Sequence, residues 1–387
     1  TGTAFTNSSS GVALIISGLI SADSFVLSDN DNHTNILNLD DQNNEVGFSI
    51  SGSDSGVANI VYINGLGATG TLDAGAGNNA ASILYLGGGA LGAASISNFG
   101  TLSLTDNEHI STARFYTSPT RLNLSGHTLT LNVAQNSLFA SNVTSGAVGS
   151  ATLSDAGTTT GISTVSSYNL NYGTNIFTLG SASQSVRGAS GADTIIVGSR
   201  IATGAFRDLS AGDTIKISSN GSIAGVSNGT LVGGNLGANN LTFSTNGISV
   251  TMTIAQNAEF TGLVINGSIS TITLADAGTA TGLIGVSKYI LANGTNAFTL
   301  GSASQGVTGS AGADTINIGA RFATGTITNL SSADTIGIGN NGSIYNVFNG
   351  IALGGSLGAA NLTFAAAGNT AQMTIAQNAE FTGTVTN

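Results

Sequence analysis

The chain contains no cysteine and no tryptophan, and its only proline is Pro119. The absence of cysteine over 387 residues excludes disulfides, thiol catalysis and cysteine-ligated zinc or iron–sulfur sites. The sequence also begins at Thr1 instead of Met. We interpret this start as the trace of a removed leader, and together with the lack of cysteine it favours an extracellular, bacterial cell-surface location.

Charged residues are also few in this chain. Only 7% of the residues are charged, with 8 basic and 19 acidic side chains and a net charge of −11. Proteins that bind nucleic acid neutralise phosphates with clustered Lys and Arg, so we expect no nucleic-acid partner. A run of about 20 apolar residues, which a membrane-spanning helix needs, is also missing. The segment Val12–Ile20 is broken by Ser17 and Gly18 and predicts a buried strand, so we expect no membrane insertion.

What the chain does contain is glycine, 56 residues of it, together with small polar residues and a 41% apolar fraction rich in β-branched side chains. An apolar fraction of this size supports a folded core instead of a disordered chain. Small residues dominate where a helical protein would place Leu, Glu and Lys, and Lys216 and Lys288 are the only lysines, so we expect few or no helices.

The sequence repeats itself with a period of 121 residues. The segment Met252–Gly262 returns as Met373–Gly383, and Asp155–Thr158 returns as Asp276–Thr279. Such a period is typical of a tandem array. We therefore predict a divergent N-terminal β region over residues 1–145, one β repeat over 146–266 and a second over 267–387.

Within each repeat, short apolar segments alternate with Gly, Ser, Asn or Asp about every nine residues. This pattern predicts an all-β fold of tandem β-solenoid or β-roll repeats, with a β-sandwich as the competing interpretation. Longer alternating segments such as Ser249–Ile254 and Asn240–Phe243 suggest additional antiparallel strands. The segment Ala255–Phe260 predicts one helical turn, with Asn257 as a candidate cap.

Two glycine-rich segments share an aspartate at the same position, Gly188–Ile195 (GASGADTI) and Gly309–Ile316 (GSAGADTI). They resemble the glycine and aspartate nonapeptides of the RTX family of secreted bacterial proteins, with Ala189 or Ser310 replacing the family's second glycine. The resemblance covers about 40 residues of each repeat. It implies secretion, a β-roll, and membership among surface-layer proteins and adhesins.

The resemblance also implies bound Ca²⁺. The expected metal site consists of the following residues: Asp193, Asp314, Asp213, Asp334, Gly191 and Gly312. In the alternative interpretation these aspartates cap turns by accepting hydrogen bonds from backbone amides, without a metal. The same two interpretations hold for Asp155 and Asp276.

Residues for catalysis are in short supply. The three histidines, His33, His109 and His127, have no sequence partner at metal-ligand spacing, and no nucleophile-elbow motif surrounds a serine. Tyr168 and Tyr289 are candidates for stacking on a sugar, but aromatics make up only 6% of the chain. We predict that the protein is not an enzyme.

The function predicted from these patterns is an extracellular structural protein that assembles into a filament, sheath or surface layer. The array stops at a repeat boundary and has few residues that protect sheet edges, so we expect head-to-tail β contacts in which Val12–Ile20 is the candidate inserted strand. Other copies of the chain are the expected partners, and a cell-surface polysaccharide is a further candidate. The alternative is a calcium-dependent adhesin or ligand-binding module.

Overall fold

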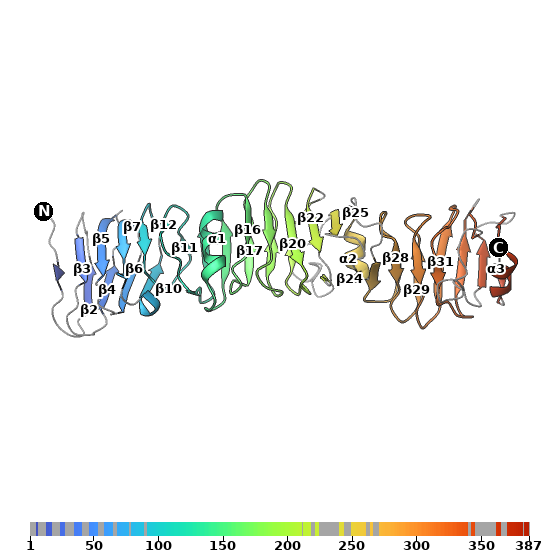
Figure 1. The fold of residues 1–387 in the computed structure, drawn as a ribbon, viewed down its shortest axis with the longest axis horizontal. Coiled ribbons are helices and arrows are strands. Elements are labelled where there is room, and N and C mark those ends of the chain that lie inside the picture. Colours follow the sequence, from blue (N-terminus) through green and yellow to red (C-terminus); the bar gives the residue numbers. More distant parts are fainter. Residues whose placement is uncertain are drawn as a thin grey trace. The chain divides into compact units, whose positions relative to one another are not determined.

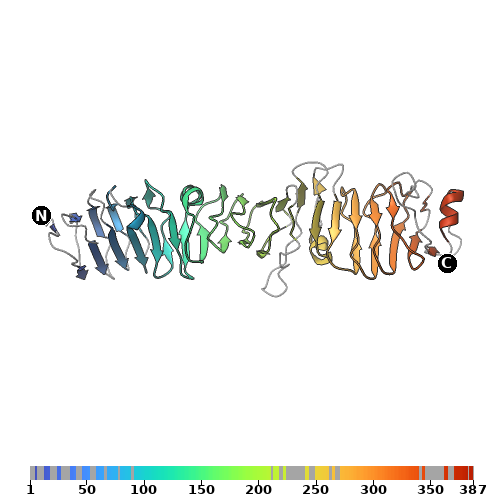
Figure 2. The ribbon, with the colours of Figure 1, turned by 60° about the horizontal axis from the view of Figure 1, so that its bottom comes forward.

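The computed structural model describes most of the chain. The described residues are 5–6, 13–17, 24–27, 35–40, 46–52, 58–64, 68–76, 79–88, 91–210, 212–217, 221–223, 240–243, 249–260, 264–265, 271–339, 342–344, 361–364, 370–381 and 383–386. They form two compact units, Thr1–Gly191 and Ala192–Asn387. Each unit is a parallel β-solenoid, in which the chain coils and successive coils stack strand on strand (Figures 1 and 2).

In the first unit two sheets form from alternating strands. One contains β1 (Phe5–Thr6), β3 (Ser24–Leu27), β5 (Val46–Gly52), β7 (Ala68–Asp73), β9 (Ser95–Ser97) and β12 (Arg114–Phe115). The other contains β2 (Ala13–Ser17), β4 (Asn35–Asp40), β6 (Asn59–Asn64), β8 (Ile83–Gly87), β10 (Thr101–Leu104) and β13 (Arg121–Asn123). A 3₁₀ turn, η1, spans Asn79–Ala81.

The later strands of this unit are β11 (Glu108–His109), β14 (Thr128–Leu131), β15 (Ser150–Leu153), β16 (Thr158–Thr160), β17 (Ser167–Asn169), β18 (Ile176–Thr178) and β19 (Ser185–Arg187). The helix α1 (Val133–Asn142) lies between β14 and β15 in the sequence.

The second unit repeats this plan. One sheet contains β20 (Thr194–Gly198), β22 (Thr214–Ile217), β23 (Asn240–Phe243) and β25 (Val264–Ile265), and β21 spans Phe206–Arg207. A second contains β24 (Ser249–Met252), β26 (Thr271–Leu274), β28 (Lys288–Ile290), β30 (Gly306–Thr308) and β32 (Ile327–Thr328).

A third sheet of this unit contains β27 (Thr279–Thr281), β29 (Asn296–Thr299), β31 (Asp314–Gly319), β33 (Thr335–Ile338), β34 (Asn361–Phe364) and β35 (Val385–Thr386). Two short helices complete the unit, α2 (Ile254–Glu259) and α3 (Ile375–Glu380).

The register of strand pairing explains why short apolar segments about nine residues apart, separated by small residues, give this fold. One coil takes about 20 residues, because Tyr168 pairs with Val186 and Thr194 pairs with Thr214 in the neighbouring coil. Side chains alternate in and out along each strand, so Ile195 and Val197 are fully buried while Thr194 and Ile196 lie partly exposed. Apolar residues at alternate positions therefore line a continuous core inside the coils.

The tandem repeat is visible in the secondary structure. The strands β15, β16 and β17 recur 121 positions later as β26, β27 and β28, and α2 recurs as α3. The predicted solenoid with few helices is therefore confirmed. The domain boundaries predicted after residues 145 and 266 stay a prediction.

Three details of the sequence-based prediction are wrong. Every strand pair identified among the described residues is parallel, including those of β23 and β24, which were expected in antiparallel sheet. The same pairing rules out the β-sandwich, because each strand returns after a full coil and not through a hairpin. The helix α2 is capped by Thr253, whose hydroxyl accepts the Gln256 amide, and not by Asn257.

The strand predicted over Val12–Ile20 exists as β2. It pairs in parallel with β4 and lies at the edge of its sheet. The surroundings of its side chains lie outside the described residues, so its predicted role as an inserted strand stays a prediction.

Candidate functional site

The aspartates predicted to bind calcium are buried between stacked turns. Asp193, Asp213, Asp314 and Asp334 are each at most 1% exposed. One carboxylate oxygen of Asp213 accepts the backbone N–H of Asp193 at 2.6 Å, and the other accepts the backbone N–H of Ser210. The second repeat has the same arrangement, because Asp334 accepts the backbone N–H of Asp314 at 2.6 Å and that of Ser331.

Asp314 is also surrounded by donors. Its Oδ1 accepts an amide hydrogen from Asn296 Nδ2 at 2.7 Å, and its Oδ2 accepts the backbone N–H of Ser310 at 2.7 Å. These bonds from the protein satisfy both oxygens of the buried carboxylate. These aspartates join one coil to the next.

Gly191 and Gly312 serve close packing of the turns. A Cβ on Gly191 would lie 1.9 Å from the carbonyl oxygen of Gly173, and one on Gly312 would lie 2.1 Å from that of Gly294. Their φ angles of +144° and +142° also favour glycine. The sequence therefore requires glycine here because two backbones meet.

The hydrogen bonds of these residues are those of turn caps. Calcium takes six to eight oxygen ligands, whereas N–H groups point at the carboxylates. Within the described ranges, no group of three or more His, Asp or Glu side chains is placed to hold a metal ion. Calcium binding stays a prediction, to be tested in solution.

A second arrangement joins each helix to the coil that follows it. In both α1 and α2 the side chains of the N-cap and N3 residues form a capping box. The next coil adds one more acceptor: Asp155 Oδ1 accepts the Val133 N–H at 2.7 Å, and Asp276 Oδ1 accepts the Ile254 N–H at 2.7 Å. The repeated Asp-Ala-Gly-Thr motif thus caps a helix of the preceding coil.

A buried asparagine and tyrosine complete this junction. The Tyr168 hydroxyl donates to Asn136 Oδ1 at 2.8 Å and accepts the Ile162 N–H at 2.8 Å. In the second unit Tyr289 makes the same two bonds, to Asn257 Oδ1 at 2.8 Å and from the Leu283 N–H at 2.9 Å.

Both tyrosines are at most 1% exposed. Burial raises the pKa of Tyr168 and of Tyr289 above the usual value of a tyrosine, because the charged phenolate would lose its hydration. The interpretation of these tyrosines as a sugar-stacking platform is wrong, since neither ring reaches the surface.

The helix α3 presents the same sequence with a different exposure. Asn136 of α1 and Asn257 of α2 are 0% and 2% exposed, whereas the equivalent Asn378 lies on the surface. Ile375 is 91% exposed, and its equivalent Ile254 is only partly exposed. Ile375 and Asn378 of α3 are therefore more exposed than the equivalent Ile254 and Asn257 of α2, which the next coil covers.

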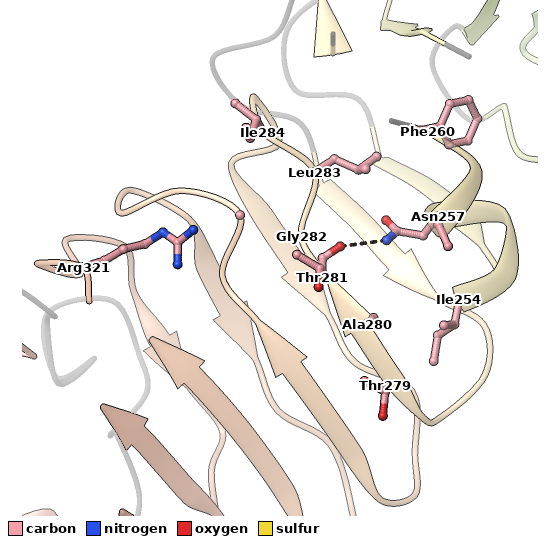
Figure 3. Close-up of a pocket in the computed structure, with 12 residues that line it drawn as sticks. Ile254, Asn257, Phe260, Thr279, Ala280, Thr281, Gly282, Leu283, Ile284 and Arg321 are labelled. Atoms are coloured by element: carbon pink, nitrogen blue, oxygen red, sulfur yellow. Dashed lines mark hydrogen bonds between the residues drawn. The ribbon is translucent and has the colours of Figure 1, made fainter. Parts of the chain in front are cut away.

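A groove of about 540 Å³ lies beside α2 (Figure 3). Its walls and floor come from Ile254, Asn257, Ala258, Phe260, Thr279, Ala280, Thr281, Gly282, Leu283, Ile284, Gly301 and Arg321. Thr279 and Thr281 are exposed on β27, while Gly282, Gly301 and Arg321 follow the carboxyl ends of β27, β29 and β31. The groove thus extends across three neighbouring parallel strands.

Among the described residues that line this groove, Arg321 is the only charged one. Figure 3 shows its guanidinium directed from the turn after β31 toward Thr281 and Gly282. Sequence reasoning missed this residue, although Arg200 stands 121 positions before it. The signal in the sequence was a basic residue that recurs at the repeat period in a chain with only 8 basic residues.

Of the three histidines named above, His33 lies outside the described residues, and the contacts of His109 are the following. His109 Nε2 lies 2.5 Å from Ser111 Oγ, two residues away, and the neighbouring Glu108 carboxylate accepts the His109 backbone N–H. No described carboxylate is recorded on the other ring nitrogen, so the arrangement lacks the third member of a serine triad. The prediction that the protein is not an enzyme stays a prediction.

These features define the chain as a tandem-repeat parallel β-solenoid with a capped helix at each repeat junction. No family model, curated protein or solved structure matches it. Among the described residues, no helix is long and apolar enough to cross a membrane.

Proposed function

We propose that the chain is an extracellular structural protein whose solenoids associate end to end into a filament, sheath or surface layer. The observation that carries this proposal is the junction between a helix and the following coil. It is built twice from the same parts, at α1 with Tyr168 and at α2 with Tyr289. A contact made of repeated parts suits association between copies as well as within one chain.

The exposed face of α3 supports the proposal. It carries the capping box of α1 and α2, with Thr374 and Gln377 in place, and Ile375 and Asn378 lie on its surface, where a following coil of this chain or of another molecule can cover them. Beside it in the sequence, β35 forms the edge of its sheet and exposes Val385 by 61%. An edge strand without Lys, Pro or a bulge favours pairing with another strand.

The experiment is negative-stain electron microscopy with sedimentation velocity on the full chain. We expect ordered polymers, and we expect Ile375→Lys and Val385→Pro each to reduce them to single particles. Val148→Lys is the matched control for the first variant, because Val148 is 66% exposed and the substitution adds the same charge. Monodisperse particles of the unmodified chain, or polymers that survive both variants, would contradict the proposal.

The second candidate is a ligand-binding or adhesive module of a secreted protein. One observation favours it, the groove beside α2 with its single arginine. The two functions are compatible, because the groove lies on the side of the solenoid and the strand edges lie at the ends of the sheets.

A further inference from the structure

The arginine of the groove has few partners of its own. The one hydrogen bond recorded for its guanidinium runs from Nη1 to the Ile318 carbonyl oxygen at a long 3.4 Å. No carboxylate within the described part of the chain is recorded as its ion-pair partner. A guanidinium has five N–H donors in a planar fork, so most of its capacity faces the groove.

The backbone beneath this arginine is the same in both repeats. The β-ladder shifts register at Gly198 and at Gly319, which have φ angles of +68° and +70°. The Nη1 atom of Arg200 lies 3.6 Å from the position of a Cβ on Gly198, and that of Arg321 lies 3.1 Å from one on Gly319. In both repeats the arginine side chain thus lies beside the bulged glycine that precedes it.

Repetition of this arginine is unusual within the chain. Of the eight basic residues, only Arg200 and Arg321 stand 121 positions apart. The groove residues repeat with them: Asn136, Phe139, Thr158, Thr160, Gly161 and Gly180 are identical to their partners in the second repeat. Arg321 makes a single long hydrogen bond within the described residues, to the Ile318 carbonyl oxygen, so packing uses little of its guanidinium.

The residues that line the groove suit a polymeric ligand that is rich in hydroxyl groups and carries carboxylates. Arginine binds carboxylates through two parallel hydrogen bonds. The exposed hydroxyl groups of Thr279 and Thr281 form the floor, and Ile284, which is 69% exposed, offers an apolar surface. Three strands spaced about 4.8 Å apart give a length of about 10 Å, more than a small anion fills.

We propose that this groove binds a linear glycan that contains uronic acid, with Arg321 holding a carboxylate. The inference does not depend on end-to-end association, since the groove belongs to one chain. The net charge of −11 opposes an acidic ligand at long range. At physiological salt the screening length is about 8 Å, so contact with the arginine outweighs distant carboxylates.

The test is isothermal titration calorimetry of the full chain with oligogalacturonate, mannuronate and hyaluronan oligosaccharides, and with a malto-oligosaccharide as the neutral probe. We expect at least one acidic oligosaccharide to bind and the neutral one not to. Arg321→Gln should weaken that binding about tenfold, and Arg321→Lys, which keeps the charge but loses the planar fork, should retain only part of the affinity.

The matched control is Arg121→Gln, which removes the same charge from an exposed arginine outside the groove. It should leave the affinity unchanged. Absence of binding to all three acidic oligosaccharides would overturn the inference, as would equal losses in Arg321→Gln and Arg121→Gln. Because the readout is binding by dilute protein, failure here is distinguishable from loss of polymers.

Discussion

Replacement of Tyr168 by Phe tests the junction between helix and coil most directly. The substitution keeps the ring and removes the hydroxyl, which leaves Asn136 Oδ1 without its donor and the Ile162 N–H without its acceptor. Both residues are fully buried at 0% exposure. An unsatisfied buried polar group costs about 1–3 kcal/mol, so we expect a loss of about 3 kcal/mol, equivalent to about a hundredfold in the local opening equilibrium.

Native-state hydrogen exchange is the appropriate assay, because long repeat arrays need not unfold in one step. The Ile162 amide should lose about a hundredfold in protection. Tyr289→Phe should likewise lower the protection of the Leu283 amide, but by a smaller factor, because Leu283 is partly exposed. Tyr172→Phe is the control, because Tyr172 is 77% exposed. Equal protection in Tyr168→Phe and Tyr172→Phe would refute the role assigned to the hydroxyl.

The same variants also test how the stability of the protein depends on pH in alkaline solution. The raised pKa of Tyr168 and Tyr289 means that the folded state keeps their protons where the unfolded state releases them. Their contribution to stability is therefore complete below about pH 10 and declines as the pH rises from there toward the folded-state pKa, by about 1.4 kcal/mol per unit for each tyrosine. Thermal melts should show this decline, and Tyr168→Phe with Tyr289→Phe should lose it.

Two further predictions concern the turns. Gly312→Ala should destabilise the second unit by more than about 3 kcal/mol, because the new Cβ would meet the Gly294 carbonyl oxygen. Gly126→Ala should cost only about 1 kcal/mol, because Gly126 has a φ angle of +87° but open space around the position of a Cβ. Chemical denaturation of the two variants measures this difference. Asp334→Ala should cost about 3 kcal/mol of stability, because the backbone N–H groups of Asp314 and Ser331 lose their acceptor. If these aspartates act as turn caps, the melting temperature of the unmodified chain should be the same in Ca²⁺ and in chelator. A higher melting temperature in Ca²⁺ would instead establish the calcium site that the sequence predicts.

The sequence was sufficient to predict the solenoid because its signals are local. Alternating apolar residues such as Ile195 and Val197, and glycine at tight turns such as Gly191, act over a few positions. The direction of strand pairing was harder to predict. The segments Asn240–Phe243 and Ser249–Met252 have the same alternation in a parallel or an antiparallel sheet, and only the coil length of about 20 residues distinguishes the two.

The roles of polar residues depended on register, which the sequence did not reveal. Asp155 stands in a motif typical of a turn, yet its carboxylate accepts a bond from Val133, 22 residues earlier. Asn257 lies near a helix start and resembles a cap, yet its partner is Tyr289, 32 residues later. A prediction of either contact requires knowledge of which residues of successive coils lie side by side.

The repeat itself separates structural from functional side chains once the partners are known. Asp213 and Asp334, Asn136 and Asn257, and Tyr168 and Tyr289 recur with their buried hydrogen bonds, so packing alone accounts for their repetition. The repeated arginine differs from them. Arg200 and Arg321 each stand two residues after a glycine with a positive φ angle, and the guanidinium of Arg321 lines a groove and makes one long hydrogen bond within the described residues. Packing against the described residues uses little of the Arg321 side chain, which leaves its N–H donors available for the external anion proposed above.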